Sequence, residues 1–196
     1  MDYDILLQIF RYFCRFVPAE VLRKMAVTPD YAAMPGASEV AQEAASHDAS
    51  VVISDIDAYI FSANPDFVSD KTRNSQTTVL FVEYGESAFK MSDTSYTIDL
   101  AVTIAAPYSK NNRDNIGEVL TFNKMLNNAI SVIKDMEAYN EADSNCGKFS
   151  VTASIHPVEP KSFYDRVGIT IFTKYTCNVL KRAGSFNVSF NKSFEV

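Results

Sequence analysis

Asp55 and Asp57 are the residues whose type and spacing first suggest chemistry. They form an Asp-x-Asp pair inside Val51–Phe61, which the sequence predicts to be a strand, so both carboxylates would lie on one face. Such a pair can hold Mg²⁺ beside phosphate groups. No glycine-rich phosphate loop accompanies it, and two carboxylates on a solvated strand are a common surface feature. We therefore predict no metal site here, with metal-dependent chemistry kept as the alternative.

The histidines and cysteines are too scattered to predict a site. His47 and His156 are the only histidines, and with Cys146 and Cys177 they supply the residue types of a zinc site. None of the short paired spacings of such sites is present, so both histidines are predicted to be surface residues. A Cys–His nucleophilic pair is formally open, but structural cysteines are the favoured interpretation.

The remaining motif searches also favour a protein without chemistry of its own. Asp143, Asn145 and Gly147 resemble a fragment of a calcium loop, but the closing bidentate glutamate is missing, and we interpret them as a turn. The sequence contains no nucleophile elbow, no Walker loop and no dinucleotide fingerprint. We predict no catalytic, cofactor-binding or metal-binding residues, no cofactor, and no enzymatic activity.

One long strand and one long helix are the strongest predicted elements. Alternation over Ser95–Ala106 places Tyr96, Ile98, Leu100, Val102, Ile104 and Ala106 on one face. After a polar loop, Pro107–Asp114, apolar residues recur at helical spacing, at Val119, Phe122, Leu126, Ala129, Ile130, Ile133 and Met136. Asn115 and Glu118 form a plausible capping box for that helix.

The amino-terminal half predicts helices, an arm and strands. A helix is expected over Tyr3–Phe16, and Pro18 suits the first turn of a second, short helix that continues to Met25. Val27–Ser50 contains two prolines and a glycine, and we predict that it is a linker or arm. The strand Thr77–Tyr84 should pair with Ser95–Ala106 as an antiparallel hairpin, with Gly85–Thr94 as a long, mobile loop.

The carboxy-terminal half predicts an acidic loop and further strands. Glu137–Gly147 is loop-like, Phe149–Ile155 alternates until Pro157 stops it, and Val167–Leu180 alternates again. The tail 185–196 has phenylalanine and valine on one face. The whole chain therefore predicts one α+β domain, residues 1–196, with an antiparallel sheet of about five strands and helices packed on one face.

The tail suggests a subunit interface. Its alternation lets it complete its own sheet or add a strand to a neighbouring subunit, where backbone pairing supplies affinity. Both readings stand at this point. The side chains predicted to form the interface are Phe186, Val188, Phe190 and Phe194.

Composition limits the partners. The chain carries 24 acidic and 18 basic residues, a net charge of −6, which disfavours a broad grip on nucleic acid and docking on an anionic membrane. The apolar amino terminus does not read as a signal peptide, and no membrane span is apparent. Three scattered cysteines fit a reducing cytoplasm.

The order of elements resembles the tail-terminator and head–tail connector (neck) proteins of tailed bacteriophages. The resemblance rests on a helix at Ile5–Val17, a hairpin at Thr77–Ala106, a helix at Glu118–Met136 and strands over Phe149–Leu180. It implies a virion protein, assembled in the host cytoplasm, that forms a homo-oligomeric ring, hexameric or higher. Neighbouring neck or tail proteins would be its partners, and DNA would pass through without sequence-specific binding.

Two other interpretations remain open. In the first, the chain is a cytoplasmic α+β domain that binds a small ligand or is a metal-dependent enzyme, with a pocket near Asp55 and Asp57. In the second, it is a bacterial accessory protein with the same fold and no virion. The arm Val27–Ser50 and the tail strand depart from the simplest connector proteins, and both suit contacts between subunits.

Overall fold

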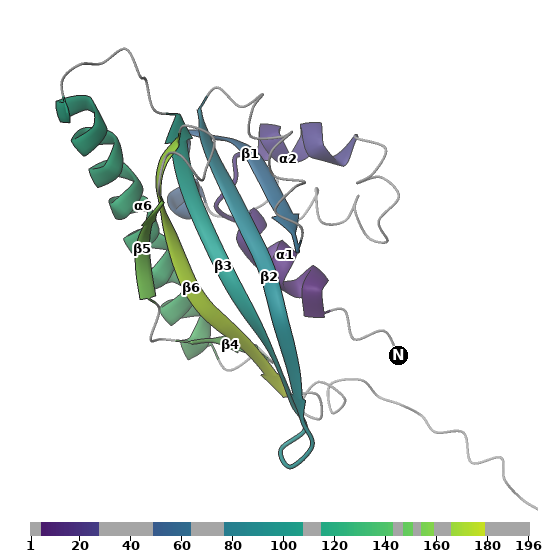
Figure 1. Cartoon of the computed structure of the whole chain (residues 1–196). Coiled ribbons are helices and arrows are strands. Elements are labelled where there is room, and N and C mark those ends of the chain that lie inside the picture. The colour runs from purple at the N-terminus through teal and green to yellow at the C-terminus, as the bar shows by residue number, and fades with distance from the viewer. Residues whose placement is uncertain are drawn as a thin grey trace, which may run out of the picture.

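A six-stranded sheet with the strand order β1-β2-β3-β6-β4 frames the molecule, and β5 also pairs with β6. The computed structural model describes residues 5–27, 49–63, 77–107, 115–142, 147–150, 154–158 and 166–178. Figure 1 shows the elements, which in chain order are α1 (Ile5–Cys14), α2 (Ala19–Ala26), the 3-10 turn η1 (Ala49–Val51), β1 (Ile56–Ser62), β2 (Thr78–Lys90), β3 (Ser95–Pro107), α6 (Asn115–Glu141), β4 (Gly147–Phe149), β5 (Ser154–Val158) and β6 (Arg166–Asn178).

Three long strands form the centre of the sheet. β2 and β3 make an antiparallel hairpin, and β3 pairs antiparallel with β6 from Ser95↔Asn178 to Pro107↔Arg166. The predicted α+β class with a mostly antiparallel sheet is confirmed, with six strands in place of about five. The expectation that every pair is antiparallel is wrong, because β1 runs parallel to β2. Parallel neighbours need a long connection, and the stretch between Ser62 and Thr78 is long enough to supply it.

One face of the sheet carries the main core. The strand alternation sends every second side chain of β3 and β6 to this face, as predicted, and residues of α1, α2 and α6 pack against it in one cluster. The members from the two strands are Ile98, Leu100, Val102, Ile104, Ile169, Ile171, Tyr175 and Cys177.

The two amino-terminal helices were predicted correctly in type. α1 buries an apolar stripe that includes Ile9 and Phe13, both fully inaccessible to solvent. The Phe13 ring packs against Phe149 of β4 with centroids 5.9 Å apart. Pro18 is the N-cap of α2, where a missing N–H costs no helical hydrogen bond.

The long helix differs from the prediction at its end and on its buried face. α6 continues to Glu141, so the loop predicted from Glu137 onwards is wrong in its first part. Tyr139 explains the extension, because its ring packs 4.9 Å from that of Tyr12. The buried residues of α6 are Met125, Ala129, Val132 and Met136. Val119, which was assigned to the apolar stripe, is 62% exposed.

Two predicted strands need correction. β1 begins only at Ile56, after the turn η1, so Asp55 precedes the strand and does not share a strand face with Asp57. The predicted strand Phe149–Ile155 is divided into β4 and β5, and Pro157 lies within β5 instead of ending it. Edge strands tolerate proline, because one row of their N–H groups needs no partner in the sheet.

Some predictions fall on residues outside the described ranges. These include most of the arm Val27–Ser50, the tail strand 185–196 with Phe186, Val188, Phe190 and Phe194, and the side chains of His47, Asp143, Asn145 and Cys146.

Candidate interaction surface on the distal hairpin

The two aspartates that first suggested a metal take part in contacts that hold the start of the sheet. Asp55 forms an ion pair with Lys124 of α6. Asp57 accepts a hydrogen bond from the Thr77 N–H at 3.1 Å. The Thr77 hydroxyl in turn donates to the Asp55 carbonyl at 2.7 Å. Both carboxylates therefore have protein partners: that of Asp55 joins the entry of β1 to α6, and that of Asp57 joins β1 to the entry of β2.

A buried arginine completes this junction. Arg166, 2% exposed, donates a hydrogen bond to the Thr77 carbonyl at 2.8 Å. Burial lowers the pKa of its guanidinium, and the charge of Asp57 acts in the opposite direction. Its role is structural, since the contact joins the first residue of β6 to the start of β2.

Those of the other sequence candidates that the structure describes are not brought together. His156 lies on the exposed β5 and contacts the Phe172 ring with centroids 5.2 Å apart. Cys14 and Cys177 are both buried in the main core. Within the described ranges, no group of three or more His, Cys, Asp or Glu side chains is placed to hold a metal ion.

The half of the β2–β3 hairpin that lies farthest from the entry of β2 is the most distinctive exposed feature. We call residues Gly85–Ser95 the distal hairpin. In Figure 1 it extends past the helices at the lower end of the sheet. β2 continues through it to Lys90, so the long, mobile loop predicted over Gly85–Thr94 is wrong. Every residue from Gly85 to Lys90 is exposed. Because neither face of this stretch is buried, its sequence lacks the alternation of apolar and polar residues from which a strand is predicted.

A β-bulge separates the distal hairpin from the rest of β2. Tyr84 pairs with Leu100, whereas Ser87 pairs with Ile98, so two residues of β2 oppose Asp99 alone. Such a bulge shifts the alternation by one residue. Beyond it, Phe89 opposes Tyr96 and lies on the same side of the sheet as the helices.

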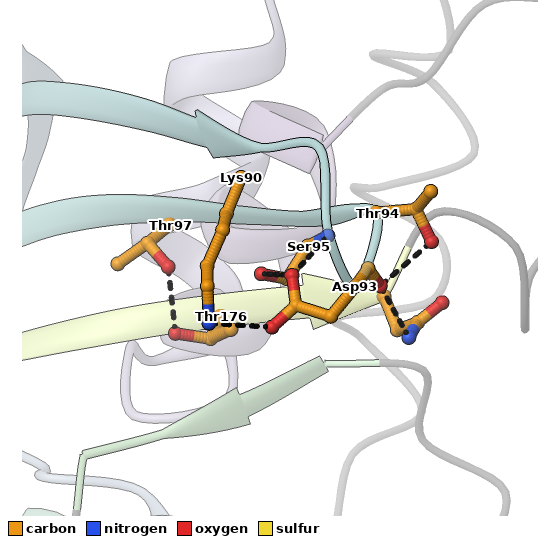
Figure 2. A network of polar contacts seen from close by, with 7 residues as sticks. Lys90, Asp93, Thr94, Ser95, Thr97 and Thr176 are labelled. Carbon is orange, nitrogen blue, oxygen red and sulfur yellow. Dashed lines mark hydrogen bonds and ion pairs between the residues drawn. The ribbon is translucent and has the colours of Figure 1, made fainter.

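Asp93 organises the turn at the tip, as Figure 2 shows. Its carboxylate accepts hydrogen bonds from the Ser95 hydroxyl at 2.6 Å and the Ser95 N–H at 3.2 Å, and it pairs with Lys90 Nζ at 3.1 Å. These contacts, led by the Ser95 hydroxyl, lower the pKa of Asp93 to about 2. Thr94 adopts a positive φ of 52°, which the tight turn requires.

The tip is also tied to the neighbouring strand. Asn178, at the end of β6, donates from its side-chain amide to the Asp93 carbonyl at 3.1 Å. Two residues farther along the paired strands, the hydroxyls of Thr97 and Thr176 are 3.0 Å apart (Figure 2). The distal hairpin is therefore held in one conformation by polar contacts although it is exposed.

Two apolar side chains are displayed on this rigid element. Phe89 is 53% exposed and Met91 is 84% exposed. A preorganised element with exposed aromatic and methionine side chains is well suited to binding another protein, because little conformational entropy is lost on association.

The sheet face opposite the helices is a second exposed region. A depression of about 490 Å³ lies on it between β2, β3, β5 and β6. Asp99 and Lys174 in its lining form an ion pair at 3.0 Å. Four residues farther along the same two strands, outside the depression, the hydroxyls of Thr103 and Thr170 are 2.8 Å apart. The other polar side chains among its described lining residues are Glu83, Ser150, Ser154 and Thr173, and the lining contains no histidine or cysteine.

No protein-family model matches this chain, and neither does any curated protein. In the described ranges, none of the helices has both the length and the apolar character needed to cross a membrane.

Proposed function

We propose that this protein is a structural, ring-forming subunit of a phage virion neck or tail, of the tail-terminator or head–tail connector type. The distal hairpin is the observation that carries the proposal, since it presents Phe89 and Met91 on a rigid, projecting element. In this role the protein joins head to tail, encloses the DNA channel and is no enzyme.

A second apolar surface supports assembly into a ring. Ile116, Val119 and Leu120 follow one another at helical spacing on the first turns of α6, and each is between 62% and 67% exposed. Figure 1 places the start of α6 at the upper end of the molecule and the distal hairpin at the lower end. Different patches at opposite ends favour head-to-tail contacts, which close into rings when the rotation per subunit permits.

The charge of the chain agrees with a DNA channel. A net charge of −6 gives a ring of subunits a strongly acidic character. Phosphate backbones are repelled by such a surface and slide past it, because no cluster of Lys and Arg displaces their counterions.

Assembly of the purified protein tests the proposal. Sedimentation velocity and negative-stain images should show closed rings, alone or on addition of its tube partner. Leu120→Asp should shift the population toward monomers, because it places a charge in an apolar contact. Val27→Asp is the matched control, since Val27 is 80% exposed but belongs to neither patch. A protein that stays monomeric at every concentration, with or without its tube partner, would exclude the ring.

A small-ligand-binding domain is the second candidate function. A hollow of about 280 Å³ beside η1 is lined by Ser50, Asp55, Lys124 and Asn128. The Asn128 side-chain amide nitrogen is buried there and has no hydrogen-bond partner among the described residues. Melting curves with Mg²⁺ and inorganic phosphate test this candidate. Equal shifts for the native protein and Asp55→Ala would dismiss the version that uses Asp55.

A further inference from the structure

The two edges of the sheet are protected to different degrees. On the β4 edge, the side-chain amide of Asn140 in α6 forms the two backbone hydrogen bonds that a neighbouring strand would otherwise make. It donates to the Phe149 carbonyl at 2.9 Å and accepts from the Phe149 N–H at 2.7 Å. On the neighbouring β5, Pro157 removes a backbone donor. Both devices disfavour the addition of another strand at this side.

On the opposite edge, the described residues provide no such protection along the distal hairpin. β1 covers β2 only as far as the pair Ser62↔Glu83. Beyond Glu83, no described strand pairs with the outer edge of β2, and the stretch Gly85–Lys90 contains no proline. An exposed edge of this kind is a template for one more strand.

The carboxy-terminal tail has the properties of that strand. It continues from Asn178, whose side chain contacts the tip of the distal hairpin, and runs to Val196. Phe186, Val188 and Phe190 alternate with Asn187 and Ser189, which gives one apolar and one polar face. Its apolar face would lie beside Phe89, where cross-strand aromatic pairs are favourable.

Charge also matches the tail to this edge. The segment 179–196, which ends in the tail, carries Lys181, Arg182 and Lys192 against Glu195 alone, so it is basic although the whole chain is acidic. Glu83 lies just before the β-bulge of this edge and Glu86 lies within it, while the charge of Lys90 is paired with Asp93. Opposite charges on the two strands favour their association and set its register.

We propose that the tail of a second copy of this chain adds to the outer edge of β2 over Gly85–Lys90 and continues the line of β1 past Ser62. We assign the donor to a second copy because β3 and β2 lie between β6, which ends beside the tip, and this edge. This inference rests on the proposed ring, in which each subunit donates one tail and accepts another.

Full-length variants with charges on opposite faces of the tail test the donor. Val188→Asp with Phe190→Asp places two charges on the apolar face, and Asn187→Asp with Ser189→Asp places the same two charges on the polar face. By sedimentation velocity, the first variant should be monomeric and the second should form rings like the native protein. Rings from both variants would overturn the tail contact and leave the proposed ring intact. A native protein that is monomeric would overturn both.

Proline substitutions test the acceptor. Successive N–H groups of a strand point to opposite edges, so Ser87→Pro and Ala88→Pro each remove a donor from a different edge of β2. One variant should keep the native melting temperature and lose the rings, whereas the other should melt earlier because it breaks pairing with β3. Two variants that both retain rings at the native melting temperature would contradict the assignment.

Mixing the variants separates a partner's tail from the chain's own. The donor-deficient variant still accepts a tail, and the edge-blocked proline variant still donates one. Their mixture should give a one-to-one dimer by native mass spectrometry, whereas each alone is monomeric. Absence of this dimer, together with an earlier melting of the donor-deficient monomer, would show that the tail completes its own sheet, and the inference would fail.

Discussion

The two halves of the β2–β3 hairpin belong to the same strands but lie in opposite environments. Near the start of β2, Leu80 and Val82 are fully inaccessible on the helix side, and Phe81 on the other side is 3% exposed. In the distal hairpin, Phe89 and Met91 are more than half exposed. The first half is stabilised by burial on both faces, and the second by backbone pairing and the contacts of Asp93.

This difference separates stability from interaction. Side chains in the buried half are constrained by close packing, so their identity is set by the core. Side chains in the distal hairpin contribute little to burial, so exposed apolar residues there are better explained by a partner. Substitutions in the first half should therefore lower stability, and substitutions in the second should change assembly or local contacts.

The largest expected effect comes from truncating a core side chain in the buried half of the hairpin. Leu80→Ala should reduce the free energy of unfolding by about 2–5 kcal/mol, since it removes packed methyl groups and leaves a cavity. Phe89→Ala removes more atoms but should cost less than about 0.5 kcal/mol in a dilute, monomeric sample. Urea unfolding followed by circular dichroism measures both. Similar losses for the two variants would mean that the distal hairpin shares the core, and the comparison would fail.

Two glycines, one in each environment, differ in the space that an added Cβ would find. A Cβ at Gly168 of β6 would collide with the Ile104 carbonyl and with Ala105, which are fixed in β3. Gly168→Ala should therefore cost about 1–3 kcal/mol through overpacking. At Gly85 the nearest atom, the Asp99 carbonyl oxygen, is 3.7 Å from such a Cβ. Gly85→Ala should be nearly neutral, and thermal melts of the two variants check the contrast.

The buried half could be predicted from sequence because a strand with a buried face has apolar residues at every second position. Alternation in Tyr96–Ala106 and Val167–Cys177 predicted β3, β6 and the face that the helices cover. The parallel pairing of β1 with β2 could not be predicted in this way. A strand's alternation describes its two faces and carries no information about the direction of its neighbour.

The distal hairpin was missed for the opposite reason. Gly85–Lys90 is exposed on both faces, so no periodicity marks it as a strand. One local signal was available: Asp93 followed two residues later by Ser95 is a common arrangement for an aspartate that bonds the backbone in a turn. That pattern predicts a tight turn, and a tight turn in turn predicts longer flanking strands.

A partly buried carboxylate in the helical layer, that of Asp135, provides the next contrast with the tip. Tyr12 donates to Asp135 Oδ2 at 2.8 Å, and Arg15 pairs with the same oxygen at 3.2 Å. Tyr12→Phe should cost about 1.5 kcal/mol, because a hydrogen bond to a charged group is lost while the Arg15 contact remains. Denaturant titrations at pH 7 measure this loss, with Tyr96→Phe as a partly exposed tyrosine for comparison.

The same tyrosine should make stability fall in alkali. Burial first, and then the charge of Asp135, raise the pKa of Tyr12 in the folded state. A raised pKa stabilises the fold while the unfolded tyrosine keeps its proton, so that contribution is complete below pH 10 and declines as the pH rises further. Tyr12→Phe should lack this part of the decline. An identical alkaline slope in both proteins would assign the decline to other groups.

The smallest expected effect concerns the carboxylate at the tip, which is fully exposed. Its pKa of about 2 lies below the ordinary 3.8, so its contacts favour the folded turn above pH 4 and are lost as the pH falls through 2. Ser95→Ala removes the largest cause and should return the pKa of Asp93 toward 3.8 in an NMR titration of its carboxyl carbon. Thr94→Ala is the control, because the Thr94 hydroxyl bonds the Asp93 carbonyl and leaves the carboxylate untouched. A pKa near 2 in Ser95→Ala would show that the hydroxyl does not organise the tip. The melting temperature of the body should stay the same in both variants, since no buried group is altered.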